Sequence, residues 1–194
     1  MVKEIQKIFH LLLSVAFSST GFIAAVTITV LAAREVSSNP YLIGIPNAFG
    51  VGGAVIGTQM FDYMSRRYSK NRALSNTFLI GALGGLIQIY SLLIDSFVIL
   101  LLGAFILGVG QSAALQTRYV ASYVASESFK ATALSLAVWF SVFGSIFGPR
   151  LVGEYSAIFD KWFGSELIVG YFIATIGMFP VSYTHLRAHE TFGY

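Results

Sequence analysis

The sequence predicts an all-α membrane protein with six transmembrane helices. Hydrophobic residues make up 56% of the chain, charged residues only 11%, and the mean hydropathy is +0.74. A water-soluble domain usually carries about 25% charged residues. Six long apolar stretches, separated by short charged loops, fill almost the whole chain. A helix needs about 20 apolar residues to cross a hydrocarbon core about 30 Å thick, and five of the six stretches reach that length.

The stretches follow one another with short connections. The first, residues 8–33, comes after Lys3 and Lys7 and is far longer than the apolar part of a cleavable signal peptide, so it is interpreted as the first transmembrane helix. The next four are expected at residues 41–61, 74–94, 97–117 and 131–152. The sixth, residues 167–180, loses its apolar character at Pro180 and offers only about 14 residues where about 20 are needed.

Residues 181–194 are predicted to be a non-native tail. The eleven residues from Val181 to Thr191 resemble the translation of a transposase-end sequencing adapter. Natural chains seldom stop halfway through a span, because unpaired backbone groups in lipid cost several kcal/mol each. We therefore expect the genuine sequence to end near Phe179, in a truncated fragment. The alternative for the tail is a metal site at His185 and His189, which stand four residues apart on one helical face.

The basic residues indicate how the chain is oriented, because cytoplasmic loops carry an excess of Lys and Arg. One side of the predicted spans would hold Lys3, Lys7, Arg66, Arg67, Lys70, Arg72, Arg118 and Lys130, and the other side Arg34, Arg150 and Lys161. The N-terminus and the loop after the second span are therefore predicted to be cytoplasmic, in a multi-pass protein of the plasma membrane. The net charge of +3 arises in these loops, so no nucleic-acid partner is expected.

The segment after the second stretch carries a recognisable charge pattern. Residues 57–67 read GTQMFDYMSRR, in which Asp62, Arg66 and Arg67 match the pattern G-x-L-A-D-R-x-G-R-R. The segment resembles motif A of the major facilitator superfamily, and the resemblance implies a breakable ionic latch between two transporter halves. Asp62 can pair with Arg66, or it can accept hydrogen bonds at the N-terminus of a neighbouring helix, where the helix dipole favours an anion.

The fifth stretch carries a glycine pattern. Residues 144–153 read GSIFGPRLVG and resemble motif C of the same superfamily, with Gly148, Pro149 and Gly153 in matching positions. Gly144 and Gly148 form a GxxxG pair that allows helices to approach closely. Pro149 removes a backbone donor and can bend the helix. The resemblance implies a packing role where the two halves meet and favours an efflux antiporter.

The fourth stretch resembles motif B of the superfamily. Phe105, Gly108 and Gly110 match, whereas Ala104 stands where the pattern has an arginine that is often linked to proton coupling. Together the resemblances cover residues 1–180. They imply the N-terminal six-helix bundle of a transporter fold of about twelve helices, whose missing C-terminal half would be its partner.

Polar residues inside the predicted spans are candidates for solute contact, because burying a polar group in lipid is costly. The candidates are Ser18, Asn47, Gln88, Gln111 and Ser112. The family resemblance implies that the first and fourth helices line the central cavity. A structural role is the alternative, because Ser can bond to its own helix and Gln can link helices at about 1 kcal/mol. Arg118 can reach Asp62 or Glu127, or extend to the membrane surface.

These features predict a secondary active transporter that moves a small organic solute by alternating access, in the direction of efflux. Its expected partners are membrane lipid, the solute and the missing half, and no cofactor, metal or enzymatic activity is expected. The alternative is a six-helix membrane protein without transport, either an intramembrane enzyme or a channel. An enzyme would need a nucleophile and base or metal ligands at depth, and a channel would need a filter or a ring of charges.

Overall fold

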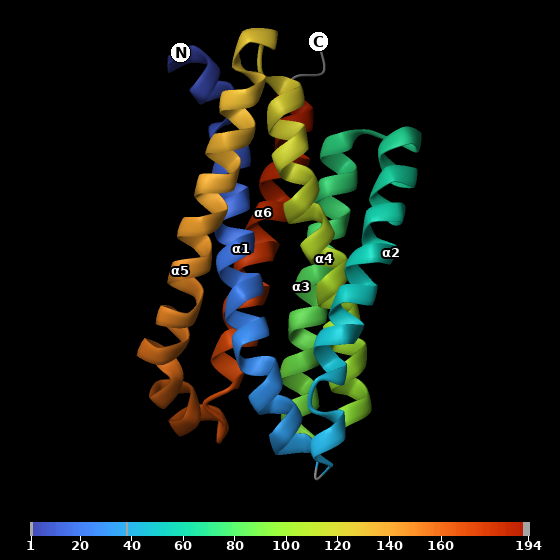
Figure 1. Ribbon diagram of the computed structural model, residues 1–194, viewed down its shortest axis with the longest axis vertical. Coiled ribbons are helices and arrows are strands. Elements are labelled where there is room, and N and C mark those ends of the chain that lie inside the picture. The colour runs from blue at the N-terminus through green and yellow to red at the C-terminus, as the bar shows by residue number, and fades with distance from the viewer. Residues whose placement is uncertain (1, 38, 192–194) are drawn as a thin grey trace.

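The computed structural model describes the backbone of residues 2–37 and 39–191 and the side chains of residues 6, 8–37 and 39–179. In that part of the chain every regular element is helical, which confirms the predicted all-α fold (Figure 1). The elements are α1 Val2–Val36, η1 Pro40–Leu42, α2 Ile45–Arg67, α3 Lys70–Leu93, α4 Phe97–Val124, η2 Glu127–Phe129, α5 Lys130–Phe163 and α6 Ile168–Thr191. Helices α1 to α5 are long and apolar enough to cross a membrane, and α6 contributes a shorter apolar stretch, Ile168–Phe179.

Several helices continue beyond the apolar stretches that predicted them. α2 continues to Arg67 rather than ending at residue 61, and α5 continues to Phe163 rather than ending at residue 152. Glu, Lys and Arg are good helix formers, so a charge ends the apolar stretch without ending the helix. α5 ends at Phe163. The next residue, Gly164, has a φ of 74°, and its N–H bonds the carbonyl of Asp160, a common helix stop.

The start of the predicted stretch 41–61 and the end of the predicted stretch 167–180 also differ from expectation. Residues 41–44 lie in η1 and the following turn, because Asn39 caps η1 and Pro46 stands in the first turn of α2, where proline is favoured. α6 runs past residue 180 to Thr191. The side chains of residues 180–194, His185 and His189 among them, lie outside the described part, and so does the prediction about the tail.

The long helices α1 to α6 form one bundle, in which α3 packs on both α4 and α6. α4 packs on α2 and α3, α1 packs on α5 and α6, and α1 and α4 also contact each other (Figure 1). α2 and α5 bury only 17% and 28% of their apolar stretches, against 50–56% for α1, α3 and α4. α2 and α5 are therefore the outer helices of the bundle. Their exposed apolar side chains, such as Val55 and Ile146, suit an environment of lipid or another protein surface.

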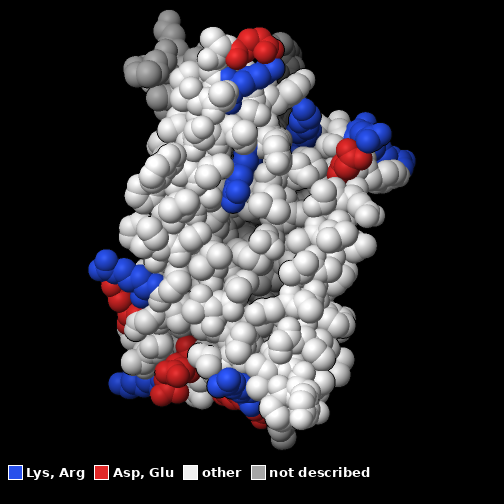
Figure 2. Space-filling model, viewed as in Figure 1, with Lys and Arg blue, Asp and Glu red and all other residues white. Residues whose placement is uncertain are grey.

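Charged side chains are confined mainly to the two ends. On the face shown in Figure 2, most Lys, Arg, Asp and Glu side chains lie toward the two ends, a few extend inward, and the central part is largely uncharged. The α2–α3 and α4–α5 connections lie at the same end of the bundle as the start of α1 (Figure 1). That end carries Asp62, Arg66, Arg67, Lys70, Arg72, Glu127 and Lys130. The largely uncharged middle is where a bilayer core would lie.

Candidate functional site

Four helices line an open hollow of about 250 Å³, which we call the carboxamide cavity. Three of the five candidate residues meet there: Asn47 from α2, Gln88 from α3 and Gln111 from α4. The full lining is Phe22, Val26, Thr29, Pro46, Asn47, Gly50, Val51, Gln88, Ala104, Leu107 and Gln111. None of these described lining residues is charged. A mostly apolar wall with a few convergent hydrogen-bonding groups is typical of a small-molecule site.

Gln88 reaches this cavity because Gly103 leaves room on the adjoining face of α4. A Cβ built on Gly103 would lie 2.5 Å from Cγ of Gln88, so any larger residue would displace the side chain. Gln88 is fully buried, and neither Nε2 nor Oε1 has a hydrogen-bond partner in the described part of the chain. Leaving such a group unpaired costs about 1–3 kcal/mol, which calls for an explanation beyond packing.

Thr29 is the polar lining residue that the sequence pattern did not single out. Its hydroxyl donates to the Ala25 carbonyl at 2.8 Å and accepts from the Tyr171 hydroxyl at 3.3 Å, so α6 helps to fix its position. The spacing of Phe22, Val26 and Thr29 at i, i+4 and i+7 places all three on one face of α1. That spacing could have identified Thr29 as a lining residue from the sequence. Thr27, by contrast, is exposed and bonds the Ile23 carbonyl.

Ser18 and Ser112 are buried but do not line the cavity. The Ser18 hydroxyl donates to the Ser14 carbonyl at 2.6 Å, and the Ser112 hydroxyl donates to the Val109 carbonyl at 2.7 Å. Ser112 also lies against Gly57 of α2, where an added Cβ would come within 2.6 Å of its hydroxyl oxygen. Both hydroxyls therefore form their hydrogen bonds within their own helix, which is the structural role that serine often takes inside a helix.

Close backbone contacts hold α2 against α4 and so fix one wall of the cavity. A Cβ on Gly53 would collide with the carbonyl of Phe105, and one on Gly108 would collide with the carbonyl of Gly50. Glycine is required at these positions because the two backbones leave no space for a side chain. The positions of Asn47 and Gln111 across the cavity follow from this contact.

The motif C residues lie on α5, where two of them face α1. A Cβ on Gly144 would collide with the Ala16 carbonyl, and one on Gly148 would lie 2.7 Å from the Thr20 carbonyl. Pro149 stands inside α5, and a Cβ added to Gly153 would have nothing within 4 Å. The glycine pair thus packs within this bundle, so an interface between two transporter halves would use another face of α5.

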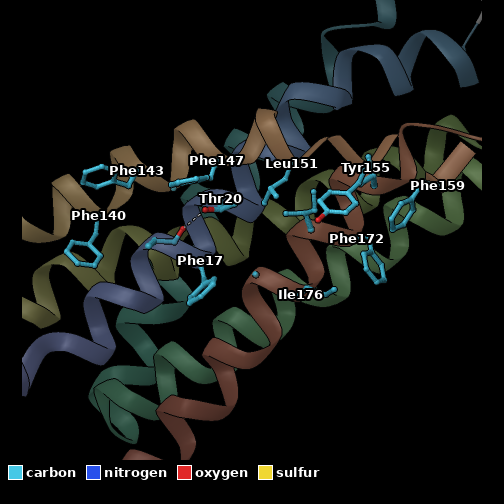
Figure 3. Close-up of a pocket in the computed structure, with 15 residues that line it drawn as sticks. Phe17, Thr20, Phe140, Phe143, Phe147, Leu151, Tyr155, Phe159, Phe172 and Ile176 are labelled. Atoms are coloured by element: carbon cyan, nitrogen blue, oxygen red, sulfur yellow. Dashed lines mark hydrogen bonds between the residues drawn. The ribbon is translucent and has the colours of Figure 1, made fainter. Parts of the chain in front are cut away.

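A second, larger hollow of about 630 Å³ lies on the other side of α1, between α1, α5 and α6 (Figure 3). We call it the aromatic groove. Its polar side chains are Thr20 and Tyr155, and Thr20 is already bonded to the Ala16 carbonyl at 2.9 Å. The lining is Ala16, Phe17, Thr20, Phe140, Phe143, Gly144, Phe147, Leu151, Tyr155, Phe159, Val169, Phe172, Ile173, Ile176 and Gly177. The groove offers contact area but few groups to orient a solute, so size does not make it the better site.

The motif A charges lie in the last turns of α2. Arg66 pairs with Asp62 at 2.9 Å, and Arg67 donates to the Tyr63 hydroxyl at 2.8 Å. The ion-paired side chains are 79% and 58% exposed, so the pair contributes at most about 1 kcal/mol to stability. Asp62 thus makes the first of its two predicted contacts, with its own helix.

Arg118 makes neither of its predicted ion pairs in the described part of the chain. Glu127 pairs with Lys130 at 2.6 Å and Asp62 pairs with Arg66, while Nε of Arg118 is buried without a hydrogen-bond partner. Among the described side chains, no group of three or more His, Cys, Asp or Glu lies close enough together to hold a metal ion.

Comparison with known proteins places the chain beside transporters. It is 30% identical over 172 residues to the uncharacterized MFS-type transporter YddS of Bacillus subtilis, which is 89% of this chain and 39% of that protein. It is 32% identical over 147 residues to the uncharacterized MFS-type transporter YdeG of the same organism, covering 76% of this chain and 34% of YdeG. A third relative, the riboflavin transporter RfnT of Brucella anthropi, is 29% identical over 122 residues, which is 63% of this chain and 31% of RfnT.

The chain therefore spans between about a third and two fifths of the length of the two Bacillus relatives. No family model matches it, and no solved structure matches it. The relatives are named as transporters, and together with the apolar helices they indicate an integral membrane protein.

Proposed function

We propose that this chain, whose similarity to MFS-type transporters supports membership of that superfamily, forms the N-terminal six-helix half of a secondary active transporter. The transporter carries a small organic solute by alternating access. The observation that carries the proposal is the carboxamide cavity, where polar side chains from α2, α3 and α4 converge in an otherwise apolar wall. Transporters of this kind bind solute at depth in the membrane, between helices that move against a second bundle.

In this proposal the carboxamide cavity is one wall of the solute site, and a C-terminal six-helix half supplies the other. Asn47, Gln88 and Gln111 contact the solute, and Ser18 and Ser112 pack the bundle. The end of the bundle that carries Arg66, Lys70 and the other clustered basic residues faces the cytoplasm of a plasma-membrane protein, in keeping with the positive-inside rule. The direction is efflux, which rests on the motif C resemblance.

The Asp62–Arg66 pair acts as a latch between the halves. Because the pair is exposed, breaking it costs little, and Asp62 is free to exchange Arg66 for a partner on another bundle as the transporter changes state. A latch that stabilises one state biases the equilibrium between inward and outward forms.

The test is transport by the complete reading frame with Asp62→Asn. One relative is named as a riboflavin transporter, so riboflavin is the first solute to assay, followed by a counterflow screen of other uncharged and charged solutes. Coupling energies between states are typically about 1–3 kcal/mol, so flux should fall by about fivefold or more.

Glu154→Gln is the matched control, because Arg150 and Glu154 form a similar exposed i, i+4 pair at 2.8 Å. That variant should transport normally. Normal flux by Asp62→Asn, with an unchanged amount of protein in the membrane, would rule out the latch.

A further inference from the structure

The carboxamide of Gln88 is the most informative polar group in the bundle. It is fully buried, it lines the carboxamide cavity, and both its donor and its acceptor atom lack a protein partner in the described part of the chain. Native proteins pair the large majority of buried polar side-chain atoms. Gly103 provides the space in which this side chain lies, so the sequence accommodates the unpaired amide.

The surrounding groups restrict what can bind there. None of the described lining residues is charged, so a solute ion would be buried without a counter-charge, at a high energetic cost. The Thr29 hydroxyl hydrogen is already donated to Ala25, which leaves Asn47, Gln88 and Gln111 as the groups with both donors and acceptors. Apolar side chains of α1 and α4, Phe22 and Leu107 among them, supply walls that suit the faces of a ring.

We propose that the cavity recognises an uncharged solute with an amide- or imide-type edge, in which an N–H stands beside a carbonyl. Because the amide atoms are fully buried, the Gln88 side chain turns toward the cavity when such an edge binds. The edge then pairs with both atoms of the carboxamide at once, the N–H donating to Oε1 and the carbonyl accepting from Nε2. Gln and Asn form paired contacts of this geometry with nucleobase edges. The inference rests on the proposed function, because it assigns the chemical class of solute to the cavity that would serve transport.

The experiment compares two fluorescent ligands on the complete reading frame, in which both walls of the proposed site are present, reconstituted in lipid nanodiscs. Lumiflavin is an uncharged ring system whose imide edge has an N–H between two carbonyls, and N3-methyllumiflavin carries a methyl group in place of that hydrogen. Fluorescence quenching should show that the methylated compound binds about 3- to 10-fold more weakly, the loss expected for one hydrogen bond. Equal binding of the two compounds would overturn the proposal, as would an absence of lumiflavin binding.

Gln88→Leu tests whether Gln88 makes the contact. This variant should bind lumiflavin about 3- to 10-fold more weakly and leave N3-methyllumiflavin unchanged, so that the preference disappears. Thr27→Val is the matched control, because Thr27 is exposed and does not line the cavity, and it should leave both affinities unchanged. A Gln88→Leu variant that keeps the preference would contradict the assignment. If the variant does not accumulate, the comparison of the two flavins on the unmodified chain still decides.

A cysteine variant separates this inference from the proposed function. The chain contains no cysteine, so Asn47→Cys carries a single thiol in the cavity. If a water-soluble maleimide labels the thiol but flavin does not bind, the proposed solute class is rejected. The cavity is then still accessible to solute, as the proposed function requires. Absence of labelling, in a chain that is folded and inserted, would reject the transport role of the cavity.

Discussion

Helix α1 separates two hollows of opposite chemistry. On one side Phe22, Val26 and Thr29 face the carboxamide cavity, and on the other Phe17 and Thr20 face the aromatic groove. Each hollow lies beside a close helix contact that depends on glycine. This contact joins α2 to α4 at the cavity and α5 to α1 at the groove. The groove is more than twice as large as the cavity, yet it presents almost only carbon.

The difference shows where this bundle keeps its polar groups. Of the two hollows, the one lined by four helices has the carboxamide side chains, which protein or solute can pair, while the groove between three helices is left apolar. In lipid an unpaired polar group is costly and an apolar one is not. The cavity is therefore the place for recognition, and the groove suits acyl chains or an apolar protein face.

The largest effects should come from enlarging the glycines that build the two hollows. Gly53→Val and Gly144→Val each place atoms against a neighbouring backbone, which cannot withdraw as a flexible side chain can. We expect each to destabilise the bundle by about 3 kcal/mol or more, the upper end of overpacking effects. Unfolding by SDS in mixed micelles measures the change.

Two nearby glycines serve as controls for these variants. Gly52 and Gly153 have nothing within 4 Å of an added Cβ, so valine there should leave stability nearly unchanged. Equal losses at all four positions would mean that glycine acts through helix conformation and not through close packing.

Gln88→Leu should stabilise the bundle while weakening binding. Leucine has a similar size, and its introduction removes a buried amide whose atoms are unpaired, so we expect a gain of about 1 kcal/mol. The same SDS titration measures it. A loss of stability greater than about 1 kcal/mol would show that the amide is satisfied by a partner within the protein, which would make it structural.

Phe147→Ala in the aromatic groove should have a smaller effect. Phe147 is 51% exposed, so it is not a core residue, for which the loss would be about 3–5 kcal/mol. Where lipid replaces the ring, we expect less than about 1 kcal/mol, and no change in lumiflavin affinity. A change in lumiflavin affinity would show that the groove affects binding in the cavity, so that the two hollows do not act separately.

Asp62→Asn should change stability least. The ion pair with Arg66 is exposed on both sides, so the loss should stay below about 0.5 kcal/mol even where transport is impaired. A large loss of stability would assign Asp62 to the fold and would leave the transport defect without a separate cause.

The all-α fold was predicted correctly because uninterrupted apolar stretches leave few alternatives in lipid. The sequence also directed attention to Asn47, Gln88 and Gln111, since polar residues stand out in such stretches, and the structure places all three around one cavity. Their contact with a solute stays a prediction. Helix ends were less predictable, because hydropathy marks the limits of a membrane core and not of hydrogen bonding.

Which side of a helix faces the cavity could not be obtained from composition. Thr27 and Thr29 look alike in the sequence, yet only Thr29 lines the cavity. Ser18 and Ser112 were predicted as cavity residues but bond their own helices, a choice that depends on the neighbouring packing. Gln88 reaches the cavity only because Gly103, on the next helix, leaves the space, which is a tertiary relation.

The most direct measurement is thiol labelling of two single-cysteine variants in a bilayer. Gln111→Cys lies in the carboxamide cavity, and Ile146→Cys lies on the outer surface of α5, where the side chain is 62% exposed. A cavity that admits solute predicts rapid labelling of Gln111→Cys by a water-soluble maleimide and little labelling of Ile146→Cys, since thiols facing lipid react slowly with such reagents. Labelling of Ile146→Cys with Gln111→Cys protected would contradict the account.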